Sequence, residues 1–407
     1  MFGGIILKHI VFVIGNYKNG GVARRSTNIA NQLAKAGYDC TILVTGEMSE
    51  TVFFEVHENV KIEELKKYQI SNQTNERFKS EAKAERKIRL LKKIQYLIPF
   101  FSNISERIST KVKFLRNGKK LLPYVLLHKD SIYIPFGSFL LTSVISALNN
   151  KNAKIIYAEI NAPEIDFPKK KAAKAEYLSV LSKINCAVFQ TEDEKSFFKG
   201  FIKNSCVIHN PISDKLPEPY TGKRRKTVVN YCRIAEQKNL KLLIDAFMVF
   251  KKSNPDYTLE IYGNTVVEEE KNELKRLIDY TKSVNAQDYV FFLKPRADVH
   301  EIVKDCAMFV SSSDFEGLSN SMLEAMAIGL PCVCTDCLGG GAREMIKDGE
   351  NGLLVPMNNI DLLVDAMHRM ANDIDLSLKC TQNATLIRKE LSLEQISKKW
   401  IKVVESI

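Results

Sequence analysis

Two consecutive doubly wound α/β domains, each built on a Rossmann-like parallel sheet, are the fold that this sequence predicts. Short β-branched and apolar runs alternate with helical patterns through the first half of the chain. The same alternation restarts after residue 226. Between the two halves, residues 206–226 contain three prolines, a glycine and a basic run, which is typical of an interdomain linker.

The first half opens with a βαβ pattern. Residues 9–15 are a β-branched run that ends in glycine, and residues 38–46 are the next strand. Between them lie a Gly20-Gly21 loop and a helix that stops at Gly37. Ligands of such sheets bind beyond the carboxyl ends of the strands, and the lack of G-x-G-x-x-G argues against a dinucleotide site. Further strands are expected at 131–135, 153–158 and 185–190.

The second half continues with βα units and ends in charged helices. Its expected strands are 227–232, 257–262, 289–293, 307–311 and 332–335, with helices near 240–252, 266–280, 298–305 and 320–329. We therefore expect a domain over 1–208 with a basic helical insertion at 76–120, a second domain over 209–390, and a helix at 391–407 that packs back on the first domain.

Composition favours a globular protein in a reducing compartment. Hydrophobic residues make up 45% of the 407, and the nine cysteines are an odd number that suits no disulfide framework. The cluster Cys332, Cys334 and Cys337 lacks the second ligand pair of a zinc site, so buried strand thiols are expected. Asp373 and Asp375 spell D-x-D, but they lie between surface helices, and we expect neither metal nor cofactor.

The first fifteen residues resemble a signal peptide only superficially. Lys8 and His9 interrupt the apolar run, and no small-residue cleavage site follows. No run reaches the ~20 apolar residues that cross a bilayer. We expect a cytoplasmic protein, peripheral on the inner face of the cell membrane.

The net charge of +11 is concentrated in one segment. Residues 76–120 hold fourteen Lys/Arg against four Glu. Within them, residues 86–101 form an apolar helical stripe flanked by Arg89, Lys92 and Lys93, as in a helix that lies on an anionic membrane. The alternative is a helix packed on its own domain with a solvated charged edge. No nucleic-acid motif accompanies the basic residues, so no nucleic acid is expected.

The stretch DFEGLSNSMLEAMAIGLPCV, residues 314–333, carries two glutamates in an otherwise apolar region. Gly317 prevents a single helix, and Ser321 with Glu324 spells a capping box for a helix that begins near Asn320 and stops at Gly329. Glu316 then lies in the preceding turn and Glu324 in the first helical turn.

This arrangement predicts a binding site for a nucleotide sugar. The N–H groups of Leu318, Ser319 and Asn320 at the helix N-terminus would bind phosphate, and carboxylates beside them would accept hydrogen bonds from sugar hydroxyls. The alternative is that Glu324 only caps its helix and Glu316 is solvated.

The segment EGLSNSMLEAMAIGLPCVCTDCLGGGAREMIKDGENGLLVP resembles the donor-site signature of the large retaining glycosyltransferase family 4, with its two glutamates separated by seven residues. Other segments resemble the family in the same order: GNYKNGGVARR, IIYAEINAP, IHNPI, YCRIAEQKNLKLLIDAF and LEIYG. The resemblance covers nearly the whole chain except the basic stretch near 65–125. It implies the GT-B fold, in which two Rossmann-like domains face each other across a cleft, and a role in bacterial surface polysaccharide synthesis.

The resemblance also implies roles for residues of the second half. Arg233 and Lys238 would bind the donor diphosphate, and Glu324 the nucleotide ribose. Glu316 would lie beside the donor sugar. These groups would act by electrostatic stabilisation without a metal, while the leaving phosphate deprotonates the acceptor.

Residues of the first half would serve both substrates. Gly20 and Gly21 would let the backbone approach the donor phosphate and the acceptor closely. Glu159 and Asn161 are candidates for the acceptor side, although Ile160 stands where relatives often carry Arg or His. Relatives usually carry a second glycine after the one at position 263, and they often carry a glycine at the position of Lys294. Both differences leave the donor base and sugar open.

Together these patterns predict a retaining, metal-independent hexosyltransferase. It would use a UDP- or GDP-sugar and a lipid-linked glycan acceptor, and it would contact the anionic membrane through residues 76–120. A soluble small-molecule acceptor is the alternative among enzymes. A catalytically inactive GT-B-like partner subunit is the alternative outside them.

Overall fold

The computed structural model describes residues 8–68 except 19 and 50–53, residues 118–148, 154–167 and 171–407 except 266, and the single positions 109 and 116. The predicted helix at 86–101 therefore lies outside the described residues, as does nearly all of the basic segment 76–120. Two compact units divide the chain. The first contains residues up to Gln190, Glu194–Ile208 and Ile396–Ile407, and the second contains Thr191–Asp193 and His209–Gln395.

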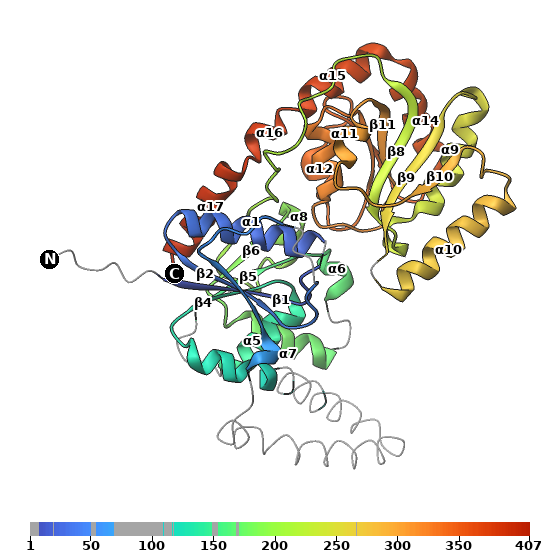
Figure 1. Cartoon of the computed structure of the whole chain (residues 1–407). Helices are drawn as coiled ribbons and strands as arrows, with labels where there is room; N and C mark the ends of the chain where they lie inside the picture. The colour runs from blue at the N-terminus through green and yellow to red at the C-terminus, as the bar shows by residue number, and fades with distance from the viewer. Residues whose placement is uncertain are drawn as a thin grey trace, which may run out of the picture. The chain divides into compact units, whose positions relative to one another are not determined.

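A parallel sheet forms the centre of the first unit (Figure 1). Within the described residues it has seven strands in the order β3-β2-β1-β4-β5-β6-β7. Their bounds are β1 His9–Ile14, β2 Asp39–Val44, β3 Val60–Glu64, β4 Ile132–Pro135, β5 Lys154–Ala158, β6 Cys186–Phe189 and β7 Ser205–Val207. The predicted strands of this half are confirmed, and the two edge strands β3 and β7 are additional.

Helices connect these strands, and the side chains between helices and sheet form an apolar core. The helices are α1 Gly21–Lys35, α5 Ser138–Leu148, α6 Pro163–Asp166, α7 Lys171–Leu181 and α8 Glu192–Phe197, with the short 3-10 helix η1 at Leu65–Lys67. The core includes Val11, Val13, Tyr133, Tyr157 and Phe189, all fully buried. Strands buried on both faces explain why their sequences are continuous apolar runs rather than alternating ones.

The C-terminal helix α17, Leu393–Glu405, contributes its last turns to the first unit. Ile396, Trp400 and Val404 lie four residues apart on one buried face, and Trp400 is 0% exposed. The guanidinium of Arg25 on α1 lies 6.0 Å from the Trp400 ring centroid, and Lys8 Nζ donates to Val404 O at 3.2 Å. Figure 1 shows α17 beside α1.

A second parallel sheet forms the centre of the second unit. Its described strands are six, in the order β10-β9-β8-β11-β12-β13. Their bounds are β8 Arg225–Arg233, β9 Thr258–Asn264, β10 Val290–Leu293, β11 Cys306–Ser311, β12 Cys332–Asp336 and β13 Leu353–Pro356. All the predicted strands of this half are confirmed, and β13 is additional.

Helices alternate with these strands and then end the unit. They are η2 Glu236–Lys238, α9 Leu240–Ser253, α10 Glu268–Ser283, α11 Val299–Val303, α12 Asn320–Ala327, α13 Gly341–Met345, α14 Ile360–Asn372, α15 Ile374–Ala384 and α16 Ile387–Glu390. Cys332, Cys334 and Cys337 are buried free thiols, as predicted. Among the residues that the structure describes, no helix has both the length and the apolarity of a membrane span.

Each sheet reverses its strand order at one place. In the first unit the reversal lies between β1 and β4, and in the second between β8 and β11. Loops that leave the carboxyl ends of two such neighbouring strands diverge, and ligands of open α/β sheets bind there. The structure therefore confirms two Rossmann-like doubly wound units and marks one candidate edge in each.

Candidate functional site

The predicted donor-site residues follow the two strands at the reversal of the second sheet. Arg233 ends β8 and Lys238 lies in the loop after it, while Glu316 lies in the loop after β11. The strands are hydrogen-bonded neighbours, with Val228 opposite Met308. Parallel pairing places both loops at the same edge of the sheet, although the residues are far apart in sequence.

Lys238 and Glu316 form an ion pair, in which Lys238 Nζ donates to Glu316 Oε1. Both side chains are only 14% exposed. Ser313 Oγ donates to the same carboxylate oxygen at 3.1 Å. Burial is the largest single influence and lowers the pKa of Lys238, but the Glu316 carboxylate, with a smaller contribution from Cys232, raises it, and the net pKa is raised. The ammonium group of Lys238 is therefore held charged at the carboxyl edge of the sheet.

Arg233 has a different carboxylate partner. Its Nη1 donates to Glu270 Oε1 at 2.7 Å and its Nη2 to Gln237 Oε1 at 3.3 Å. Glu270 is 4% exposed in the first turn of α10, whereas the Arg233 side chain is 51% exposed. Gln237 Nε2 donates onward to Phe315 O at 2.8 Å. A half-exposed guanidinium that is oriented from behind can still bind an anion from the solvent side.

Backbone contacts fix the two loops to each other. Asn239 adopts the left-handed conformation, with φ 43°, and its side chain caps α9 by accepting from Leu242 N. Its Nδ2 donates to Asp314 Oδ1 at 2.8 Å, and Asp314 N donates to Gln237 O at 2.9 Å. Asn tolerates this backbone region better than most residues, which accounts for it at the junction of η2 and α9.

Helix α12 begins at Asn320, as predicted, but a different residue caps it. Ser319 Oγ accepts from Met322 N, so the capping box of Ser321 and Glu324 was wrong. Glu324 is the fifth residue of the helix and belongs to the second turn, not the first. Its Oε2 accepts from His300 Nε2 at 2.9 Å. Gly329, at φ 70°, follows the last turn as the sequence predicts.

The start of α12 is held from the chain segment that enters the second unit. Asn210 Nδ2 donates to Leu318 O at 3.1 Å and to Asn320 Oδ1 at 3.0 Å. Gly341 lies directly behind this turn, since a Cβ there would meet Gly317 O at 1.8 Å. The predicted anion-binding turn, Leu318 to Asn320, is therefore rigidly placed beside the loop of Glu316.

The predicted residues of the first unit lie at the carboxyl edge of its own sheet. Gly20 immediately precedes α1 with an extended backbone, φ −168°, so its conformation alone does not require glycine. A Cβ on Gly20 would meet only Lys18 O, at 4.0 Å. Open space, not backbone strain, is what this glycine provides.

Glu159 follows β5 and is 1% exposed. Tyr157 OH donates to its Oε2 at 2.5 Å, and the amides of Ile160 and Asn161 donate to its Oε1 at 2.9 and 3.4 Å. Its carboxylate thus braces the loop that carries Asn161.

Sequence reasoning missed three side chains that hold the predicted donor-site residues. Glu270 orients Arg233, Gln237 joins Arg233 to the loop of Glu316, and His300 bonds Glu324. The only sequence signal was the acidic start of the helix at Glu268–Glu270. Neither Gln237 nor His300 belongs to a pattern that singles it out.

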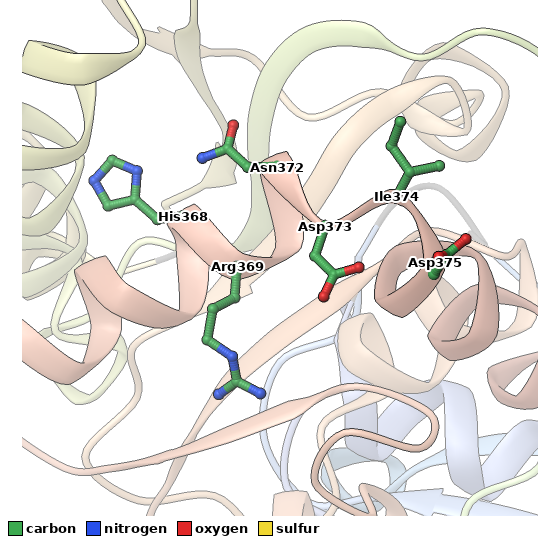
Figure 2. A pocket seen from close by; sticks show the side chains of 6 residues that line it. All are labelled: His368, Arg369, Asn372, Asp373, Ile374 and Asp375. Carbon is green, nitrogen blue, oxygen red and sulfur yellow. The ribbon is translucent and has the colours of Figure 1, made fainter.

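A separate cavity of about 760 Å³ lies where α14 meets α15. Figure 2 shows its six lining side chains along the end of α14 and the start of α15: His368, Arg369, Asn372, Asp373, Ile374 and Asp375. Asp373 caps α15 by accepting from Leu376 N at 2.9 Å. Helix capping therefore explains the first aspartate of the D-x-D motif. None of the predicted donor-site residues lines this cavity.

Comparisons with known proteins agree with the fold. Residues 214–386 match the family described as Glycosyl transferases group 1. An uncharacterized glycosyltransferase of Haemophilus influenzae is 28% identical over 398 residues, which cover 97% of this chain and 99% of that protein. Over 148 residues, 36% of this chain and 38% of the relative, identity is 34% to the N-acetylgalactosamine-N,N'-diacetylbacillosaminyl-diphospho-undecaprenol 4-alpha-N-acetylgalactosaminyltransferase of Campylobacter jejuni.

The crystal structure of Anabaena HepE with UDP and glucose has the same fold. The TM-score is 0.72 with 17% identity, and the match covers 98% of this chain and 99% of HepE. The two parallel-sheet units are thus those of a GT-B protein. The chain is a glycosyltransferase, and its residues 214–386 match the glycosyl transferases group 1 family.

Proposed function

We propose that this glycosyltransferase moves a hexose-type sugar from a nucleoside diphosphate sugar to a lipid-linked glycan, with retention of configuration. The carrying observation is the pair of loops after β8 and β11, which hold Lys238 against Glu316 and keep Arg233 half-exposed beside them. Two cations at the carboxyl edge of a doubly wound sheet suit a donor diphosphate.

Charge stabilisation would supply most of the catalysis. As the sugar leaves, negative charge accumulates on the diphosphate, and preorganised cations stabilise that charge most strongly where water is excluded. Lys238 meets this condition at 14% exposure. In the proposed reaction the leaving phosphate takes the proton of the acceptor hydroxyl on the face from which it departs. Such a step needs neither a protein nucleophile nor a metal ion.

The donor base is proposed from the neighbours. HepE is a protein of the same fold whose crystal structure contains UDP and glucose, so UDP-sugars are the first donors to test. The test is nucleotide release from UDP-, GDP- and ADP-sugars by the full chain. Arg233→Ala and Lys238→Ala should each lower kcat about 100-fold. Lys241→Ala, which removes an α9 ion pair with Asp245, is the matched control and should change little.

The acceptor is proposed from the Campylobacter jejuni relative, whose described substrate is a diphospho-undecaprenol glycan. A matched pair of acceptors tests it: one glycan on a polyprenyl diphosphate and the same glycan without the lipid. Transfer to the first alone supports a lipid-linked acceptor. Equal transfer to both would favour the soluble small-molecule acceptor, and turnover of no donor at all would favour an inactive partner subunit.

Membrane contact is proposed on the composition of residues 76–120. Binding to anionic vesicles should weaken with salt and should be lost when Arg89, Lys92 and Lys93 are changed together to Glu. The matched control changes three lysines outside this segment, Lys226, Lys271 and Lys304, to Glu. Equal binding by the first triple variant and the wild type would overturn membrane contact.

A further inference from the structure

His300 is a side chain of the second unit to which neither the sequence analysis nor the comparisons give a role. It lies in α11, after β10, and its Nε2 is 2.9 Å from Glu324 Oε2. Because an ionised carboxylate can only accept, Nε2 carries the hydrogen and donates it. The bond joins two elements that are separated by 24 positions in the chain.

The His300 ring is itself fixed by a neighbour. Tyr231 on β8 presents its ring edge-on to His300, with centroids 5.6 Å apart and planes at 90°. Tyr231 OH donates to Ser321 O, in the first turn of α12, at 2.9 Å. Tyr231 therefore contacts both His300 and the helix that carries Glu324. Two residues after Tyr231 the same strand ends in Arg233.

The hydrogen bond from His300 is important to the Glu324 carboxylate because both side chains are largely buried. The His300 side chain is 16% exposed and that of Glu324 10%. A carboxylate that is largely removed from water needs hydrogen-bond donors to stay charged and in one orientation. Within α12, Met322, Leu323, Ala325 and Met326 are almost fully buried and apolar, so the side chains of these four neighbours offer the carboxylate no hydrogen-bond donor.

We propose that His300 is a positioning residue that holds the Glu324 carboxylate in the orientation needed to accept hydrogen bonds from the donor ribose. This inference rests on the proposed function, in which Glu324 binds the ribose. His300 itself would touch no substrate. Its loss should therefore weaken nucleotide binding through the ribose hydroxyls and leave the chemical step unchanged.

Calorimetric titration with two probes, UDP and 2′,3′-dideoxy-UDP, separates positioning from general damage. His300→Ala should weaken UDP binding about tenfold, the effect of one lost hydrogen bond to a charged group. His300→Gln should restore most of the affinity, since a Gln amide nitrogen can replace Nε2 as donor. With dideoxy-UDP, wild type and His300→Ala should bind alike, because the hydroxyls that Glu324 would hold are absent. His368→Ala, on α14 beside Asn254, is the matched control and should bind both probes as the wild type does.

The same inference predicts that His300→Ala changes the donor KM but not kcat. With a turned-over donor, His300→Ala should raise the donor KM about tenfold and leave kcat within twofold. UDP binding by His300→Ala equal to wild type would overturn the inference, and so would an equal loss for both probes. If the wild type binds GDP or ADP in place of UDP, the same comparison is made with that nucleotide and its dideoxy form. A wild-type protein that binds no nucleoside diphosphate overturns the proposed donor site itself, and the inference with it.

Discussion

The two sheets reverse their strand order in the same way, yet the edges at the reversals differ in chemistry. In the second unit the loops after β8 and β11 bring the largely buried side chains of Lys238 and Glu316 together at the carboxyl edge of the sheet. In the first unit Glu159 follows β5, the strand next to β4 of the reversal. Its buried carboxylate accepts hydrogen bonds from Tyr157 and from its own loop. A glutamate after a parallel strand can thus pair with a cation, as Glu316 does with Lys238, or brace the backbone, as Glu159 does. Its hydrogen-bond partners, not its position in sequence, distinguish the two cases.

The largest expected effect comes from Glu316→Gln in the second unit. The amide keeps the shape and can still accept from Lys238, but it removes the negative charge beside the proposed donor. We expect kcat to fall about 100-fold, with a smaller loss of the free energy of unfolding because the largely buried Lys238 loses its charged partner. Steady-state nucleotide release and thermal unfolding measure the two quantities. Glu301→Gln, at an exposed ion pair with Lys304, is the control. Unchanged kcat would erase the contrast between the two edges.

Glu159→Ala should have the opposite profile. It removes the carboxylate that accepts from Tyr157 OH and from the amide of Ile160, which leaves Tyr157 OH only its longer contact with Tyr177 OH and costs about 2 kcal/mol of the free energy of unfolding. The single tryptophan, Trp400, is buried in the first unit, so its fluorescence in urea reports on that unit. Glu58→Ala at an exposed position should leave the urea midpoint unchanged. Normal stability with lost transfer would instead make Glu159 an acceptor-side group.

Gly20→Ala sharpens the comparison at the first edge. The extended backbone accepts alanine, and a Cβ would meet nothing closer than 4.0 Å, so stability should hold. If a substrate approaches this loop closely, as proposed, kcat/KM should fall about tenfold because the methyl group occupies that space. Activity equal to wild type would show that no ligand atom comes near Gly20.

The smallest effect is a pH dependence of the first unit. Burial is the main cause that lowers the pKa of His9, aided by His128 and Lys61 and opposed by Asp39 and Glu63. The unfolded chain takes up this proton near the ordinary value of 6.5, whereas the folded chain takes it up only at lower pH. The contribution of His9 to stability is therefore fully present above pH 6.5. It is lost as the pH falls from 6.5 through the lower pKa of His9 in the folded chain.

The comparison variant is His9→Gln, because Gln can keep the bond to Thr41 Oγ1, which His9 Nε2 makes at 3.0 Å. Trp400 fluorescence in urea at pH 7.5 and 5.5 should show a smaller loss on acidification in His9→Gln than in wild type. An equal acid loss in both proteins would assign it to other groups.

The sequence predicts the strands well where burial on both faces makes them apolar and β-branched. It fails at β3, VKIEE, whose exposed edge position allows charged residues, and at β7, whose three residues are too few for a pattern. At α12 three consecutive residues, Ser319, Asn320 and Ser321, are all good caps. Asn210 donates to Asn320 from another segment, and His300 donates to Glu324. Which of the three residues caps the helix therefore depends on tertiary contacts and not on the local sequence.

The site is predictable only as far as residue type. Lys238 and Glu316 were both candidates, but their pairing spans 78 positions and follows from the strand order β8–β11, which no local pattern contains. Glu270 and His300 act through other side chains. A glutamate at a helix start and a histidine in a short helix are common in any protein, so their sequence context carried no signal.

The return of α17 to the first unit has a consequence for synthesis on the ribosome. Residues 396–407 are made after the whole of the second unit, yet they belong to the first unit, and Trp400 fills its core. The unit made second, which ends at Gln395, can therefore complete its core before the unit made first. Until residues 396–407 have been made, nascent chains should carry an open, apolar site on the first unit that these residues later close.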